Sequence, residues 1–246
     1  MLARNPDRPF SAWLIERIPQ TVRLRSGLRV HLRNHADAVV FWNVFTSGEY
    51  LALVRDLADL DVEVVVDCGA GIGMFSLLVE HLCRVGLLDW EDVEVEAIEP
   101  AQYNLPQLRK NLDRNLADGR YTIHEGVVGG GEGSVVFYET PKYPWSGSLV
   151  ERKEMEGRAV EAPVVDLPSI VAGRPAVLKL DVEGAEFEVF EAHASSLGSV
   201  EAVVVEWHVE MGDVERGGGL LREGGFDFVR RSKSDGNRLV DLYRRA

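Results

Sequence analysis

The stretch EVVVDCGAGIG, residues 63–73, decides the fold class of this chain. Residues 63–67 form a short apolar run that predicts a buried strand, and glycines follow at positions 69, 71 and 73. From residue 73 to residue 85, apolar side chains recur at helical spacing. A strand, a glycine turn and a helix in this order are typical of sheets that bind an anionic group at the helix N-terminus.

Short strands and helices continue to alternate along the chain. Further strands are expected at residues 93–99, 121–128, 134–138, 176–182 and 201–207, and helices from Pro100 and from about Ala185. Residues 226–230 and 238–243 flank a Ser-Asp-Gly-Asn turn, which predicts an antiparallel hairpin that closes the sheet. The fold class is therefore α/β, with a Rossmann-like, doubly wound sheet that is mostly parallel and has one antiparallel strand near the C-terminus.

A different pattern precedes this alternation. Residues 22–32 alternate about a Ser26-Gly27 turn, which predicts a hairpin, and a helical stretch follows over residues 38–60, broken near Ser47-Gly48. We expect residues 1–60 to form an N-terminal extension of hairpin and helices, and residues 61–246 to form a single compact domain.

The composition excludes several classes of protein. The formal charge of −13, from 40 acidic and 27 basic residues, disfavours a nucleic-acid surface and a polybasic membrane patch. Cys68 and Cys83 are too few for a disulfide scaffold or a multi-cysteine zinc site. No apolar run is long enough to span a bilayer and the N-terminus lacks a signal-peptide pattern, so a cytoplasmic location is expected. The excess of arginine over lysine and of valine over isoleucine indicates a GC-rich bacterial genome.

The glycine loop favours S-adenosylmethionine (SAM) over NAD as the cofactor. The dinucleotide fingerprint would place its third glycine at position 74, which is Met74, whereas the third glycine here is Gly73. Glu99 ends the second strand of the alternation, where an acidic side chain accepts hydrogen bonds from ribose hydroxyls. The alternative interpretations are that Glu99 only caps the next helix and that Asp67 only caps the helix after the loop.

The fourth strand adds a family resemblance. Its sequence LKLDVEGAE, residues 178–186, resembles the hallmark of the FkbM family of SAM-dependent methyltransferases. In the same order along the chain, the resemblance extends to Asp37, Gly48-Glu-Tyr50, VDCGAGIG (66–73), AIEP (97–100), WSGSL (145–149) and VEWH (205–208). The chain departs from the family at Gly71, where asparagine is frequent, and at residues 164–167, a shortened form of the usual Leu-Asp-Asp-Leu.

The resemblance implies a class I methyltransferase domain over residues 61–246 that transfers a methyl group from SAM to a hydroxyl of a small natural product or sugar. Three alternatives remain at this point: N- or carboxyl-methylation, an NAD-dependent oxidoreductase, and a non-catalytic SAM-binding protein. The expected partner is a small-molecule acceptor, with neither nucleic acid nor membrane, and a homodimer is left open.

The predicted site residues fall into two sets. The cofactor set is Glu49, Tyr50, Asp67, Gly69, Ala70, Gly71, Gly73, Glu99, Pro100, Asn104, Glu125, Gly126, Val127 and Asp181. The catalytic set is Asp181, Glu183, Glu206 and His208, because the ends of neighbouring parallel strands meet beside the ligand in such a sheet. Within the cofactor set, residues 125–127 are expected beside the adenine.

His208 is the expected general base, since the ordinary pKa of histidine lies near neutral pH. A divalent cation on Asp181, Glu183 and Glu206 is left open, because oxygen ligands suit magnesium. Tyr50, Trp145 and Trp207 are candidates for an aromatic wall around the sulfonium. Residues 139–157, rich in proline and glycine, are predicted to form a lid.

Overall fold

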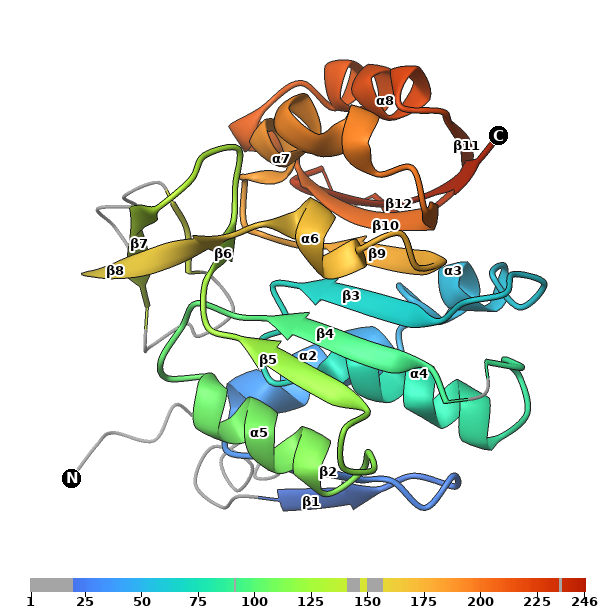
Figure 1. Cartoon of the computed structure of the whole chain (residues 1–246). Helices are drawn as coiled ribbons and strands as arrows, with labels where there is room; N and C mark the ends of the chain where they lie inside the picture. The colour runs from blue at the N-terminus through green and yellow to red at the C-terminus, as the bar shows by residue number, and fades with distance from the viewer. Residues whose placement is uncertain (1–19, 91, 141–146, 150–156, 235) are drawn as a thin grey trace.

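The computed structural model describes residues 20–90, 92–140, 147–149, 157–234 and 236–246. At its centre is a seven-stranded sheet with the order β11-β12-β10-β9-β3-β4-β5 (Figure 1). The parallel strands are β3 (Val64–Cys68), β4 (Glu94–Ile98), β5 (Tyr121–His124), β9 (Ala176–Leu180) and β10 (Val200–His208). β12 (Arg238–Arg245) runs antiparallel to both of its neighbours, β10 and the edge strand β11 (Phe226–Ser234). The predicted fold class is confirmed.

The central strands β3 and β9 are buried on both faces, because helices cover each face of the sheet. Along β3, Val64 and Val66 pack into one apolar core and Val65 into the other, as the alternation of strand side chains requires. Above one face lie α2 (His35–Phe45), α3 (Leu51–Arg55), α4 (Met74–Arg84) and α5 (Leu105–Asp113). The other face is covered by α6 (Leu167–Val171), α7 (Glu186–His193) and α8 (Val214–Glu223).

The N-terminal hairpin forms as predicted from β1 (Gln20–Arg23) and β2 (Arg29–Leu32). It lies beside α5 (Figure 1), where Asn115 Oδ1 and Asn111 Oδ1 accept hydrogen bonds of 2.8 and 2.9 Å from the backbone of Arg29 and His31. Val30 of the hairpin is fully buried in the same core as α4 and α5. The described part of the extension therefore shares its apolar core with the sheet domain.

Two local predictions are wrong or incomplete. The helix expected from Pro100 begins only at Leu105, since the carboxylate of Glu99 draws the intervening backbone into a turn by accepting from Ala101 N. The strand expected at residues 121–128 divides into β5 and β6 (Val127–Val128), which leaves the main sheet. β6 instead joins β8 (Arg158–Val165) and the antiparallel β7 (Ser134–Glu139) in a separate three-stranded sheet.

The helix α8 was not predicted, because three glycines at 217–219 weaken its helical pattern. At two of these positions there is no room for a side chain. A Cβ at Gly217 would lie 2.6 Å from the Trp207 ring, and one at Gly218 would lie 2.8 Å from the Tyr243 hydroxyl. Asp213 caps this helix by accepting from the backbone of Glu215 and Arg216. Among the described residues, no helix has the length and apolar character needed to cross a bilayer.

Candidate functional site

A cavity of about 690 Å³ opens where the carboxyl ends of β3, β4, β9 and β10 meet α2 and the two residues before α3, Glu49 and Tyr50. This is the crevice at which doubly wound sheets bind their ligands. The cavity has two ends with different chemistry. The glycine loop and Glu99 form one end, and Asp181, Glu183, Glu206 and His208 form the other.

The glycine loop approaches β9 so closely that position 69 excludes a side chain. Gly69 has a φ of +74°, and a Cβ there would lie 1.8 Å from the carbonyl oxygen of Asp181. Gly71 also has a positive φ, +57°, but a Cβ there would meet nothing within 4 Å. Glycine and asparagine both adopt this left-handed conformation, which explains how either residue can stand at position 71. The loop thus lines the cavity with backbone.

Glu99 connects this loop to the next turn. Its carboxylate accepts from Gly71 N at 2.7 Å, from Ala101 N at 3.0 Å and from Asn104 Nδ2 at 3.2 Å. Burial raises the pKa of Glu99 to about 7, although these three donors act in the opposite direction. Glu99 therefore presents to the cavity a carboxylate that these three hydrogen bonds hold in place.

Lys179 on β9 lies beneath the loop and was not predicted as a site residue. Its ammonium donates to the carbonyl of Gly69 at 2.7 Å and lies 3.2 Å from Asp67 Oδ1 and 3.6 Å from Asp181 Oδ2. Burial alone would lower the pKa of Lys179, but the charges of Asp67 and Asp181 outweigh it and raise the pKa. Asp67 is fully buried. Lys179 therefore links the glycine loop, through the Gly69 carbonyl, to Asp181.

Asp67 has the capping role that was left open. It accepts from the backbone and the hydroxyl of Ser76 in α4 at 3.2 and 2.7 Å. It does not line the cavity, and neither does Gly73, whose missing side chain lets α4 pack against Leu108. Glu125 also lies outside the cavity and forms an ion pair with Arg109 at the surface. The other predicted cofactor residues all line it: Glu49, Tyr50, Gly69, Ala70, Gly71, Glu99, Pro100, Asn104, Gly126, Val127 and Asp181.

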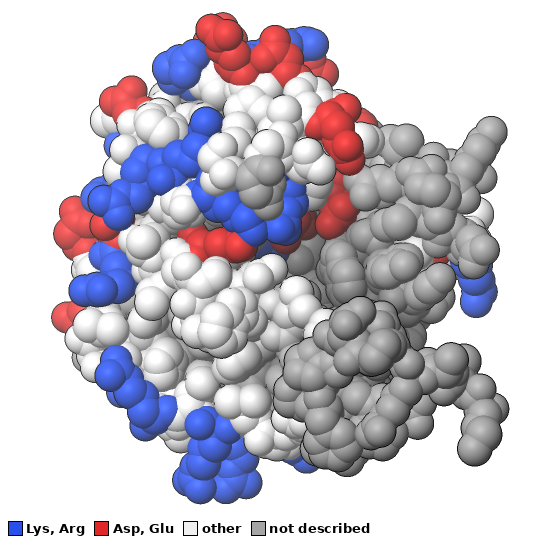
Figure 2. Space-filling view, turned by 180° about the vertical axis from the view of Figure 1, so that it is seen from behind, with Lys and Arg blue, Asp and Glu red and all other residues white. Residues whose placement is uncertain are grey.

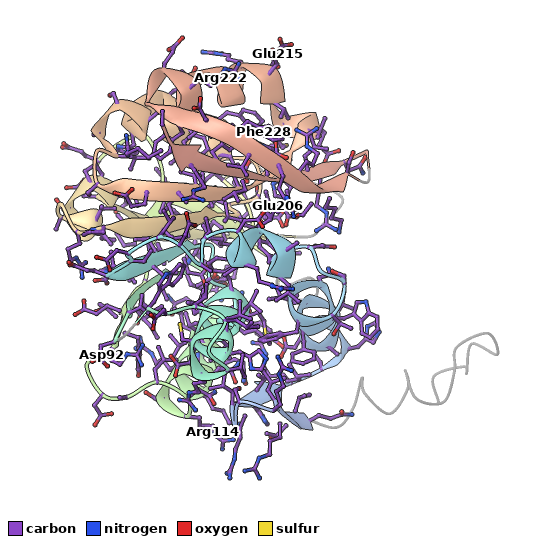
Figure 3. All side chains as sticks on the ribbon, turned by 90° about the vertical axis from the view of Figure 1, so that its right-hand side faces the viewer. Asp92, Arg114, Glu206, Glu215, Arg222 and Phe228 are labelled. Carbon is purple, nitrogen blue, oxygen red and sulfur yellow. The ribbon has the colours of Figure 1, made fainter. Side chains whose placement is uncertain are left out.

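At the other end, Glu206 is held by side chains from two distant segments. The Tyr50 hydroxyl donates to Glu206 Oε2 at 2.7 Å, and Arg238 Nη1 lies 2.8 Å from Oε1. Burial and the charge of Asp181 raise the pKa of Glu206, whereas Arg238 and Tyr50 lower it. Figure 3 shows Glu206 between the C-terminal strands and the helices of the N-terminal region. Its position therefore depends on residues 156 and 32 places away in the sequence.

His208 ends β10 and is enclosed by carboxylates. Its Nδ1 lies 2.9 Å from Glu186 Oε1, and its Nε2 lies 3.6 Å from Glu183 Oε2. Burial alone would lower the pKa of His208, but the hydrogen bond to Glu186 and the charges of Glu186, Glu183 and Asp181 raise it to about 9. The expected general base was a histidine with an ordinary pKa, and the surrounding carboxylates make His208 more basic than that.

Glu186 is the residue that organises this end. It is fully buried, and its Oε1 also accepts from the backbone of Val182 and Gly184, both at 3.1 Å. These bonds hold the turn after β9, in which Glu183 has a left-handed φ of +54°. Glu186 was not among the predicted site residues, and its contact with His208 was missed.

The aromatic wall and the lid that were predicted from the sequence are only partly found among the described residues. Trp207 is fully buried against Phe187 and Phe190 rather than lining the cavity, whereas Tyr50 does line it. Trp145 and most of the predicted lid, residues 141–146 and 150–156, lie outside the described residues. Of that segment, Gly147 and Leu149 line the cavity, and Ser148 Oγ donates to the carbonyl of Glu183 at 3.1 Å.

The sequence reasoning missed Arg33 and gave Asp37 no role, although both line the cavity. Arg33 Nη2 donates to Asp37 at 2.9 Å and to Asn104 Oδ1 at 3.1 Å, and Asn104 in turn donates to Glu99. This chain of contacts joins the N-terminal extension to the cofactor end. The presence of Asp37 in the family resemblance was the one available signal.

Two features of the cavity lining fit SAM. The bare backbone at Gly69 and Gly71 permits close approach of a ligand, and Glu99 offers a buried acceptor for ribose hydroxyls. Asp181, Glu206 and His208 could in addition hold a cation, because one ligand atom of each lies within 4.8 Å of the others. This set differs from the one expected, in that His208 replaces Glu183.

This chain is similar to known methyltransferases in sequence family and in fold. A family model for the methyltransferase FkbM domain matches residues 67–233. The solved structure of Escherichia coli yhhF, provisionally named a methyltransferase, superposes with a TM-score of 0.50 at 16% identity, over 92% of this chain and 98% of that chain. Aeropyrum pernix fibrillarin, solved with bound SAM, has a TM-score of 0.47 and 13% identity, over 92% and 82% of the two chains. No curated protein gives a match.

Proposed function

Because the chain belongs to the FkbM methyltransferase family and is a SAM-dependent methyltransferase, we propose that its acceptor is a hydroxyl of a small sugar or natural product. Family membership excludes the NAD-dependent oxidoreductase that the glycine loop alone left open. The observation that carries the proposal is the cluster of four ionisable side chains, Asp181, Glu183, Glu206 and His208, that line the cavity at the carboxyl ends of β9 and β10.

The loop, Glu99 and Asn104 supply the cofactor end in this proposal. The ribose hydroxyls would donate to Glu99, and the loop backbone would meet the amino-acid part of SAM. Gly126 and Val127 line the cavity next to this end and are proposed to bound the adenine. Loss of the Glu99 carboxylate should cost on the order of 1.5–3 kcal/mol of SAM binding, the range for a hydrogen bond to a charged group.

The acceptor end must orient an oxygen and take a proton. SAM, when bound, supplies a methyl group on a positively charged sulfur, which leaves with the electron pair of the broken bond. The rim carboxylates accept hydrogen bonds from the hydroxyl and orient its oxygen along the line of transfer. A rim carboxylate takes the hydroxyl proton in this proposal, because Asp181, Glu183 and Glu206 all line this part of the cavity.

The size and charge of the site support a small acceptor. A volume of about 690 Å³ lies within the range of ligand cavities for small molecules. On the part of the rear face that is not drawn in grey, acidic and basic side chains adjoin each other and form no continuous basic stripe (Figure 2). Nucleic-acid recognition would need such a stripe. We further propose a cytoplasmic, bacterial setting, which rests on the composition.

One alternative acceptor is favoured by a specific observation. The acceptor end carries Asp181, Glu183, Glu206 and Glu210 against Lys179 and Arg238, so its carboxylates outnumber its permanent cations. An amine would be attracted to this end as a cation, whereas a carboxylate acceptor would be repelled. N-methylation is therefore the second candidate, and carboxyl methylation is disfavoured.

The test is to incubate the purified chain with methyl-labelled SAM and a panel of matched alcohols, amines and carboxylates of sugar and polyketide type. Formation of an O-methyl product, identified by NMR, would support the proposal, and an N-methyl product would support the alternative. SAM binding without turnover on any acceptor of the panel would contradict the proposed acceptor classes. Glu99→Ala is the matched control, since it should reduce turnover through weaker SAM binding.

A further inference from the structure

We propose that Asp181, Glu206 and His208 form a binding site for a divalent cation of the Mn²⁺ type, which holds the acceptor hydroxyl. The role of the cation rests on the proposed function, whereas its binding does not. One oxygen from each carboxylate and one imidazole nitrogen lie within 4.8 Å of one another, close enough to surround a single ion. Asp181 follows β9, and Glu206 and His208 end the neighbouring strand β10, so the sheet itself holds all three.

The orientation of His208 is the second observation, and it is independent of the clustering. Glu186 Oε1, fully buried, lies 2.9 Å from Nδ1 and fixes that nitrogen as a donor. The nitrogen left for the cavity is Nε2. A carboxylate that holds the distal nitrogen of a histidine is the usual arrangement behind metal-binding imidazoles, because it fixes the ring and increases its basicity.

Glu206 is held in the same manner. Tyr50 donates to one oxygen and Arg238 lies against the other, so the carboxylate cannot rotate away from the cavity. Each carboxylate oxygen still has lone-pair capacity beyond these two contacts. Glu206 and His208 thus have fixed positions before any ion binds, which lowers the ordering cost of binding.

The donor set indicates which ion fits. Two carboxylates favour magnesium and manganese, and one imidazole favours the first-row metals, so manganese satisfies both preferences. Three protein ligands would leave open positions for the acceptor hydroxyl. A hydroxyl bound to the ion becomes more acidic; its proton passes to Glu183, the rim carboxylate outside the ligand set, and its oxygen bonds to the methyl carbon. The carbon–sulfur bond breaks with its electron pair on sulfur.

Binding of Mn²⁺ alone tests the site without any acceptor. Titration followed by EPR should show one ion per chain, with ¹⁴N coupling from the imidazole. Asp181→Asn, Glu206→Gln and His208→Gln should each weaken binding at least about tenfold, and Glu186→Gln should weaken it about 10–100-fold through the orientation of His208. Glu183→Gln removes a charge 3.6 Å from His208 Nε2, so it should weaken Mn²⁺ binding less than the ligand variants do and should lower kcat. Glu96→Gln, which alters a carboxylate paired with His124 outside the cavity, is the matched control.

Absence of saturable binding, or absence of ¹⁴N coupling in the unaltered protein, would overturn the site even if every variant failed to fold. An O-methyl product formed at an unchanged rate after chelation would overturn the role of the cation while the proposed function stands. Saturable binding with ¹⁴N coupling and an exclusively N-methyl product would support the site while the proposed acceptor fails.

Discussion

The two ends of the cavity are built in different ways. The cofactor end comes from short, contiguous pieces of chain: the loop after β3, the turn after β4 and the backbone contacts between them. The acceptor end gathers Tyr50, Asp181, Glu206, His208 and Arg238, which are held by side-chain contacts across as many as 156 residues. Backbone geometry defines the first end, and buried charge pairs define the second.

This difference predicts how each end fails. A change in the loop backbone should remove the cofactor end together with the packing of β3 on β9, because position 69 touches the Asp181 carbonyl. A change at the acceptor end should leave the fold and the cofactor end in place and affect turnover. Lys179, which contacts both ends, should show both effects.

Gly69→Ala should have the largest effect. The added Cβ would lie 1.8 Å from the Asp181 carbonyl, and the φ of +74° is unfavourable for alanine, so the loop and β9 must separate. We expect a loss of more than about 4 kcal/mol of stability and no measurable SAM binding. Gly71→Ala, with open space around it, should cost only about 1–2 kcal/mol. Equal stability of the two variants in denaturant unfolding would refute the contrast.

Lys179→Met should lower the free energy of unfolding by about 3–5 kcal/mol, because it leaves the fully buried Asp67 without its ion-pair partner. Adding Asp67→Asn should restore part of this loss. Arg244→Gln, which breaks an ion pair with the exposed Asp59, is the control and should cost less than about 1 kcal/mol. A double variant no more stable than Lys179→Met would contradict the assigned pairing.

Titration of Glu99 should change the stability of the protein and its affinity for SAM in opposite directions as pH rises. Since burial raises its pKa from 4.5 to about 7, the stability that its protonated form contributes is present below pH 4.5 and is lost as pH rises through about 7. The total change is on the order of 3 kcal/mol. SAM affinity should instead fall as pH falls below about 7, because the ribose hydroxyls donate to the ionised carboxylate. Unfolding and calorimetric titrations of Glu99→Gln should lack both trends.

Tyr50→Phe should have the smallest effect of these variants. It should alter only the acceptor end of the cavity. It removes the 2.7 Å hydrogen bond to Glu206 and leaves Arg238 in contact with that carboxylate. We expect kcat to fall about tenfold with the KM for SAM unchanged. Tyr103→Phe, at a half-exposed ring outside the cavity, should leave both constants unchanged. An increase in the KM for SAM without loss of kcat would place Tyr50 at the cofactor end instead.

The boundary expected at residue 60 stays a prediction. Arg33, Asp37, Glu49 and Tyr50 precede it and line the cavity, and Val30 shares a core with α4 and α5. The extension therefore takes part in the site, whatever the boundary between folding units. A truncation before residue 61 should remove the chain of contacts from Arg33 through Asn104 to Glu99.

The sequence by itself determined the strands of the central sheet in chain order, the reversed strand near the C-terminus and the glycine loop with Glu99, because apolar periodicity and glycine positions act locally. It also brought Asp181, Glu183, Glu206 and His208 together, since adjacent parallel strands end at one edge. Only the tertiary structure decided that Glu186 holds His208, that Tyr50 and Arg238 hold Glu206 and that Lys179 lies under the loop. The physical reason is that the protonation and orientation of a buried charge depend on neighbours that folding brings close, and their spacing in the sequence does not reveal them.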